Sequence, residues 1–182
     1  MKFLALGDFR RGRVTLNSRV SEYDYASFRQ LKRTLGMGRS GELDAGLQTF
    51  SEFVRYMSNT SECDGLVFKS SGAINVPRNA SQGHAYVDDV VNMAIRITEA
   101  CAVRLKASVT GDLDRSQMLL TLTGPSFSEP VSFGGTHDQT HKLQPGDYVL
   151  KAGYELAAIL PDGGLSGKSL TIEMQVSLTP AS

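Results

Sequence analysis

Between Ser169 and Thr179, apolar and polar side chains alternate without a break. The apolar positions are Leu170, Ile172, Met174, Val176 and Leu178. Successive side chains of an extended chain point to opposite faces, so this spacing places all of them on one face, whereas a helix would scatter them around its axis. A strand with one apolar and one polar face is typical of antiparallel sheets. This pattern predicts a half-buried antiparallel strand.

The same period of two recurs earlier in the chain, in Met93–Ile97, Val103–Val109 and Met118–Leu122. Residues that favour turns stand between these runs, at 111–116, 124–125, 145–146 and 161–164. Short strands that each carry one apolar face need a second sheet to cover that face. The sequence therefore predicts a mainly β chain, with an antiparallel β-sandwich of jelly-roll type over residues 61–182.

Residues 1–60 are expected to form a basic N-terminal extension. A spacing of three, three and four predicts a helix over Tyr23–Leu35 that ends at Gly36; the apolar positions that carry it are Tyr25, Phe28, Leu31 and Leu35. Residues 43–57 fit either a second helix or a strand, because Gly46 disfavours a helix and several side chains suit a strand. Residues 58–85 are rich in Ser, Asn and Gly, which predicts loops around a short strand at 65–69.

Charge is balanced overall but not along the chain. The 19 Lys and Arg residues match 19 Asp and Glu residues, which excludes a generally basic surface for nucleic acid. The first 40 residues nevertheless hold nine basic and three acidic residues. This asymmetry indicates either a solvated basic face or a surface that meets an acidic partner. The candidate partner-binding residues are Arg10, Arg11, Arg13, Arg29, Lys32 and Arg33.

The composition is that of a soluble globule, with 41% hydrophobic and 21% charged residues among 182. The apolar run at Phe3–Leu6 is too short for a signal peptide, and no run approaches the ~20 apolar residues of a membrane span. We therefore expect synthesis in the cytoplasm without export. Two cysteines, Cys63 and Cys101, are too few for a disulfide framework, and whether they are bonded stays open.

Two constellations are weak candidates for metal binding. His137 and His141 stand four apart and could share a metal on a helix, but on an extended chain their rings would be roughly 13 Å apart. The alternative, which we prefer, is an exposed polar loop after Gly134-Gly135. Asp112 and Asp114 loosely resemble part of a calcium loop, but the bidentate acid that completes such a loop is missing, which favours a solvated turn.

Signatures of catalysis and of cofactor binding are weak in this sequence. It contains no G-x-S-x-G elbow, and neither cysteine has a histidine nearby in a nucleophile signature. The glycine spacing at Gly36–Gly41 binds a dinucleotide only inside a βαβ unit, and the surrounding pattern does not predict one. We expect no cofactor and no enzymatic activity.

Residues 102–180 resemble the exported bacterial β-sandwiches of the PEP-CTERM type and, more loosely, bacterial pre-peptidase C-terminal domains. The resemblance rests on the runs Val103–Val109, Leu119–Gly124 and Leu143–Leu150, which include a Pro-Gly turn before an aromatic strand. It implies a non-catalytic role in adhesion or assembly and assigns no site residues. The sequence differs from these families because it shows neither their signal peptide nor their sorting tail.

Three functions are compatible with these features. The first is a non-catalytic structural or assembly protein that acts through its surface, for example a virion subunit that decorates a capsid or belongs to a tail, with protein partners and a homo-oligomer or larger assembly. The second is a carbohydrate- or ligand-binding sandwich module, which the absence of Trp disfavours. The third is a metal-dependent hydrolase that uses His137 and His141.

Overall fold

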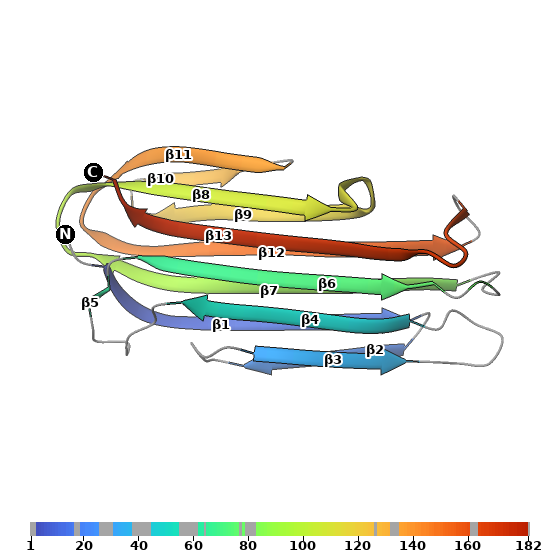
Figure 1. The fold of residues 1–182 in the computed structure, drawn as a ribbon. Coiled ribbons are helices and arrows are strands. Elements are labelled where there is room, and N and C mark those ends of the chain that lie inside the picture. The colour runs from blue at the N-terminus through green and yellow to red at the C-terminus, as the bar shows by residue number, and fades with distance from the viewer. Residues whose placement is uncertain are drawn as a thin grey trace.

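The protein is a stack of two antiparallel β-sheets (Figure 1). The computed structural model describes the backbone of residues 3–16, 19–25, 31–37, 45–54, 62–63, 65–76, 78, 83–125, 127–131, 135–160 and 164–181. Side chains are described for residues 65–76, 78, 84–125, 135–160 and 164–181. The prediction of a mainly β chain with two antiparallel sheets is confirmed, whereas the jelly-roll topology stays a prediction.

Among the residues that the structure describes, seven strands form one sheet, which we call sheet A. Its order is β10 (Phe127–Val131), β9 (Ser116–Gly124), β12 (Gly146–Leu160), β7 (Gly83–Ile97), β1 (Phe3–Leu16) and β2 (Arg19–Tyr25), and β5 (Glu62–Cys63) also pairs with β1. The two longest strands, β7 and β12, have 15 residues each and pair along their whole length in the middle of the sheet.

The second sheet, sheet B, has six strands in the described part of the chain. Its order is β11 (Thr136–Leu143), β8 (Cys101–Gly111), β13 (Ser169–Pro180), β6 (Leu66–Asn75), β4 (Ala45–Val54) and β3 (Leu31–Met37). The chain passes between the sheets several times, for example from β8 to β9 through a single 3-10 turn at Leu113–Arg115. Strands β10 and β11 end the two sheets on the same side of the sandwich (Figure 1).

The core between the sheets follows the period of two. On β13, every apolar residue from Leu170 to Leu178 is buried and the residues between them face outward. The same holds for Val103–Val109 on β8 and for Met93–Ile97 on β7. The alternation predicted for these strands is confirmed, and it aligns their apolar faces in one continuous core.

The helix expected over Tyr23–Leu35 is not confirmed. Its described ends are extended: Tyr23 to Tyr25 close β2, and Leu31 onward forms β3, while residues 26–30 lie outside the described residues. A spacing of four, as between Leu31 and Leu35, satisfies a strand as well as a helix. β3 pairs with β4 over seven residues, and the backbone hydrogen bonds of this pairing favour a strand over a helix from Leu31 onward.

Two other segments are more extended than the sequence predicted. Within 43–57, where helix and strand were left open, Ala45–Val54 is a strand. The short strand expected at 65–69 is the first part of the ten-residue strand β6, while the loops expected over the rest of 58–85 give way to the remainder of β6 and to the start of β7. Small polar residues such as Ser70 and Ser71 suggested a loop, but β6 pairs with a strand on each side.

Strands from the expected N-terminal extension belong to the same two sheets as residues 61–182. β1 pairs with β7 from Phe3 to Leu16, and β4 pairs with β6. A domain boundary near residue 60 stays a prediction. Within the described part of the chain, no helix has the length and apolar character needed to cross a bilayer.

Candidate ligand-binding groove

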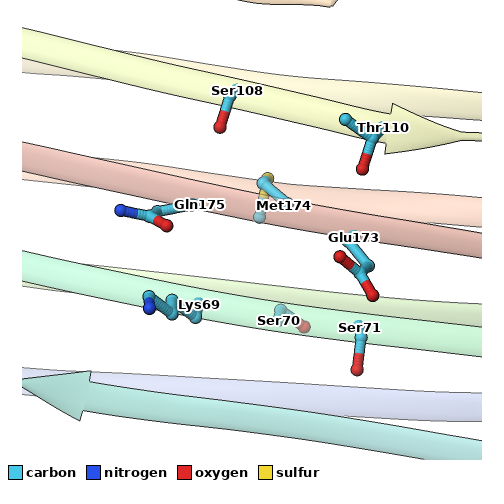
Figure 2. Close-up of a pocket in the computed structure, with 8 residues that line it drawn as sticks. All are labelled: Lys69, Ser70, Ser71, Ser108, Thr110, Glu173, Met174 and Gln175. Atoms are coloured by element: carbon cyan, nitrogen blue, oxygen red, sulfur yellow. The ribbon is translucent and has the colours of Figure 1, made fainter.

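A shallow groove of about 420 Å³ crosses the middle of the outer face of sheet B (Figure 2). Three adjacent strands, β6, β13 and β8, supply its lining. The lining residues are Lys69, Ser70, Ser71, Ser108, Thr110, Glu173, Met174 and Gln175. Ser70 and Met174 are buried toward the core, so the other six form the surface that solvent meets.

Strand register arranges these six side chains in two rows across the sheet. Gln175 of β13 is opposite Lys69 on one side and Ser108 on the other. Glu173 is opposite Ser71 and Thr110 in the same way. Residues directly opposite in an antiparallel pair have Cβ atoms about 4.5–5.5 Å apart, so each row presents three neighbouring polar groups.

The groove exists because its side chains differ in length. Ser71 and Ser108 are short and only half exposed, while Lys69, Glu173 and Gln175 extend from the same face and are exposed. Figure 2 shows the hydroxyls of Ser108 and Thr110 on one side of β13 and those of β6 on the other. The lining offers donors and acceptors, one cation and one anion, and no aromatic ring.

A second depression, of about 550 Å³, lies at one end of β8, β11 and β13. Its lining is Arg104, Asp138, Thr140, Thr179, Pro180 and Ala181. Here the charged groups bind each other, because Arg104 donates two hydrogen bonds of 2.6 Å to the Asp138 carboxylate. The Arg104 guanidinium holds the pKa of Asp138 below its ordinary value. This pair leaves fewer groups available to a ligand than the groove over β13.

The two candidate histidines lie on a strand, not in the exposed loop that we expected. His137 and His141 both face inward from β11 and are only 9% and 7% exposed. Their ring centroids are 6.3 Å apart with nearly parallel planes, much closer than the roughly 13 Å expected for an extended chain. The backbone at these two positions is extended, and the short distance arises because the two rings lean toward each other.

The described residues contain no group of three or more His, Cys, Asp and Glu that could hold a metal ion. Asp112 instead ties the β8–β9 connection to β13: its Oδ2 accepts a 2.7 Å hydrogen bond from the Thr171 amide, and its own amide donates to the Thr171 carbonyl. Asp114 is exposed and lies 3.7 Å from Arg115. The two aspartates thus take part in separate local contacts.

Three candidate partner-binding residues, Arg10, Arg11 and Arg13, lie on β1, which pairs with β2 on one side and with β7 on the other. On β1, Arg11 is opposite Asp24 of β2, and Arg13 is opposite Glu22 of β2 and Asp88 of β7. Arg10 is opposite Tyr25 and Val91. The register thus places acidic residues of this chain opposite two of the arginines.

The other three candidates belong to the segment that was expected to be helical. Lys32 and Arg33 are on β3, opposite Phe50 and Thr49 of β4, and Arg29 lies outside the described residues. Partner binding by these six residues stays a prediction.

Sequence reasoning missed a polar cluster inside the core. Ser70 of β6, Asp89 of β7 and Tyr154 of β12 are all buried, and Asp89 is fully so. Ser70 donates a hydrogen bond of 2.5 Å to Asp89 Oδ2, and its Oγ lies 3.3 Å from the Tyr154 hydroxyl. The phase of the alternation could have revealed it, because Asp89 has the same parity as the buried residues Val87 and Val91.

Cys101, whose bonding the sequence left open, is a free thiol at the start of β8. Partial burial raises the pKa of its thiol above the ordinary value. The side chain of Cys63 lies outside those described. Cys101 is not among the residues that line the groove.

No family model and no curated protein matches this chain. Among solved structures, a GH31 alpha-xylosidase from Xanthomonas citri aligns with 90% of the chain at 9% identity and a TM-score of 0.25. The chain spans 30% of the length of that enzyme. Similarity at this level carries no argument about fold or activity, and the resemblance of residues 102–180 to PEP-CTERM-type and pre-peptidase C-terminal domains stays a prediction.

Proposed function

We propose that this protein is a non-catalytic β-sandwich that binds an uncharged polar ligand in the groove on sheet B. The observation that carries this proposal is the pair of polar rows across three strands. One row consists of Lys69, Gln175 and Ser108, and the other of Ser71, Glu173 and Thr110. A rigid sheet holds such groups at fixed spacing, so a ligand that matches them loses little binding energy to ordering the site.

The chemistry of the lining favours a polyhydroxylated ligand such as a neutral oligosaccharide. Hydroxyl groups both donate and accept, and so do the side chains of Ser71, Ser108, Thr110 and Gln175. Lys69 and Glu173 balance each other, so the groove attracts neither anions nor cations strongly. Because no aromatic ring lines the groove, hydrogen bonds rather than stacking would supply the affinity, which favours weak binding.

The positions of the other polar residues support a non-catalytic role. His137 and His141, the residues considered for a hydrolase, face inward and are almost covered. Asp89 and Tyr154 do not line the groove, and the side chain of Ser70 is buried and bonded to Asp89. A general acid or base must come within hydrogen-bond distance of its substrate.

The test is titration of the isotope-labelled protein with a neutral tetrasaccharide, cellotetraose, followed by amide chemical shifts. We expect shifts that saturate at millimolar ligand and that are concentrated at Ser71, Ser108, Glu173 and Gln175. The variant Gln175→Ala removes the centre of one row and should weaken binding about tenfold, since it leaves ligand hydroxyls without a partner.

Thr171→Ala is the matched control, because Thr171 faces outward on the same strand but does not line the groove. Its affinity should equal that of the wild type. Shifts that fail to saturate, or a Gln175→Ala variant that binds as tightly as the wild type, would contradict the proposal.

A role as a subunit of a larger assembly, including a virion, is the second candidate. The observation that favours it is β11, which ends sheet B and has a strand on one side only within the described part of the chain. An edge strand carries unpaired backbone groups that can add a strand from another molecule. Sedimentation of the purified chain over a range of concentrations tests whether it associates with itself.

A further inference from the structure

The open side of β11 is defined by two backbone hydrogen bonds. The Val109 amide of β8 donates to the Gly135 carbonyl at 2.8 Å, so this pair exchanges bonds across the β8–β11 ladder. The Ala102 carbonyl, opposite Lys142, accepts instead from Ala181 on the other side of β8. Hydrogen-bonded and non-bonded pairs alternate along an antiparallel ladder. The amides and carbonyls of Thr136, Asp138, Thr140 and Lys142 therefore point to the open edge.

The side chains at these same positions are exposed on the outer face of sheet B. Asp138 is ionised and paired with Arg104 at 2.6 Å. Lys142, four residues further on, forms no ion pair among the described residues. Thr140 lies midway between them. Along β11 itself the charge order is thus minus, neutral, plus, which becomes complementary to itself when a second copy runs in the opposite direction. The Asp138 carboxylate, although bound by Arg104, has further lone pairs that can accept from a second cation.

We propose that a second copy of this chain pairs with β11 through its own β11, antiparallel, with Thr140 opposite Thr140 of the second copy. Asp138 of each copy is then opposite Lys142 of the other, and the two six-stranded sheets become one. The proposal rests on the assembly role put forward above. The twofold axis passes through the Thr140 pair, so the contact is the same for both molecules, as a closed dimer requires.

Charge and hydrogen bonding select this register over its neighbours. A shift of one residue would place the open amides and carbonyls of one copy opposite residues of the other copy whose amides and carbonyls already bind β8. Hydrogen bonds between the two copies could then not form, because bonded and non-bonded pairs alternate along the ladder. A shift of two residues would keep the backbone hydrogen bonds but place Asp138 and Lys142 opposite uncharged residues, Thr140 among them. A shift of four residues would place Asp138 opposite its own copy, or Lys142 opposite its own copy. Like charges directly opposite destabilise a sheet, while opposite charges stabilise it.

The features of the neighbouring edge support the choice of β11. At the same side of the sandwich, sheet A ends in β10, which contains Pro130. Proline has no amide hydrogen, and proteins use it to protect sheet edges from pairing. β11 contains no proline and extends over eight residues. Lysine also protects edges, but here the register gives Lys142 an acidic partner.

Sedimentation velocity of the full chain and of charge variants tests the pairing. We expect a concentration-dependent dimer for the wild type. Lys142→Asp would place acid opposite acid twice, and should raise the dimer dissociation constant at least about tenfold. The double variant Asp138→Lys/Lys142→Asp restores opposite charges across the axis and should recover the dimer. A double variant that is as monomeric as Lys142→Asp would overturn the register.

Cross-linking supplies a second measurement that does not depend on charge. In the variant Thr140→Cys, with Cys63 and Cys101 replaced by alanine, the two Cα atoms would be about 5.5 Å apart, within the range of roughly 4.4–6.8 Å that a disulfide spans. Mild oxidation should yield a covalent dimer. Thr136→Cys in the same background is the control, because the register separates the two copies of residue 136 by about 26 Å.

The outcomes separate the pairing from the wider assembly role. A wild-type chain that is monomeric at all concentrations contradicts both self-association and this interface. A different outcome is a wild-type oligomer that Lys142→Asp does not affect, with equal cross-linking of Thr140→Cys and Thr136→Cys. That result would be compatible with the assembly role but would overturn the β11 interface.

Discussion

Ser70 on β6 and Asp89 on β7 are joined by a 2.5 Å hydrogen bond in the centre of the core. β6 belongs to sheet B and β7 to sheet A, so this bond connects the two sheets directly. An ionisable group inside an apolar core costs free energy unless hydrogen bonds satisfy it. The bond forms only when the two sheets are aligned along their strands, so it favours one alignment over the displaced ones.

Replacing Ser70 tests this role. Ser70→Ala removes a hydrogen bond from the buried Asp89, and we expect it to lower the free energy of unfolding by about 1–3 kcal/mol. Ser71→Ala is the control, since Ser71 is the next residue on the same strand but faces outward; its effect should stay within about 0.5 kcal/mol. Urea unfolding followed by circular dichroism measures both. Equal effects for the two variants would show that the bond does not stabilise the core.

Gly72 provides the space that the Tyr154 hydroxyl occupies beside this cluster. A Cβ atom at position 72 would lie 2.8 Å from the Tyr154 hydroxyl oxygen and 3.2 Å from a methyl of Val87. We expect Gly72→Ala to lower the free energy of unfolding by about 1–3 kcal/mol because the core is overpacked.

The combination Gly72→Ala/Tyr154→Phe tests the cause of that loss. Removing the hydroxyl relieves the closest contact, so the double variant should lose less stability than the sum of the single losses. Strict additivity in urea unfolding would mean that the Tyr154 hydroxyl is not the obstacle.

The strands of the core could be predicted from the sequence because their alternation is nearly unbroken. β13 shows this best, since its buried residues are the apolar ones from Leu170 to Leu178. The prediction failed where a strand buries polar residue types. β11 turns His137 and His141 inward, so it had the composition of a loop. β6 turns Ser70 inward, so the strand expected at 65–69 stopped short of its second half. Tertiary pairing, which no local pattern records, makes them strands.

The candidate groove could be predicted only in part. Alternation along β13 assigns Glu173 and Gln175 to the outer face from the sequence alone. Their neighbours Lys69 and Thr110 come from strands that are distant in the chain, and only the strand register brings them together. The same holds for the basic candidates, because only the register shows that Arg13 is opposite Glu22 and Asp88. Partner binding by Arg13 stays a prediction.

Two exposed ion pairs, Arg96–Asp147 and Arg104–Asp138, make a contribution to the free energy of unfolding that depends on pH. Arg96 donates hydrogen bonds of 2.6 and 2.9 Å to the Asp147 carboxylate, and holds the pKa of Asp147 below its ordinary value of 3.8. A lowered pKa in the folded state stabilises the fold above the pKa of the unfolded chain, near 3.8. That contribution is lost as the pH falls through the lower folded-state pKa.

Carboxyl carbon shifts measured across an acid titration check this. Arg96→Gln should raise the pKa of Asp147 toward 3.8 and leave that of Asp138 unchanged. Arg104→Gln should do the reverse, so each variant serves as the control for the other. If neither substitution moved the pKa of its partner, the solution structure would lack these contacts.

Gly111 at the end of β8 combines a positive φ of 112° with a close backbone contact. A Cβ atom here would lie 2.2 Å from the Thr171 carbonyl oxygen. That oxygen accepts a hydrogen bond from the neighbouring Asp112 amide. Backbone atoms of a paired strand cannot move aside as a flexible side chain can. We expect Gly111→Ala to lower the free energy of unfolding by about 3 kcal/mol or more, the sum of torsional strain and steric overlap.

Gly135→Ala separates the two causes. Gly135 also has a positive φ, of 89°, but nothing lies within 4 Å of a Cβ atom added there. Its substitution should cost only the torsional part, about 1–2 kcal/mol. Urea unfolding of both variants gives the difference, which reports the clash with Thr171. Equal losses would mean that β8 and β13 separate at this end without cost, and that the hydrogen bonds of Asp112 to Thr171 do not hold the connection in place.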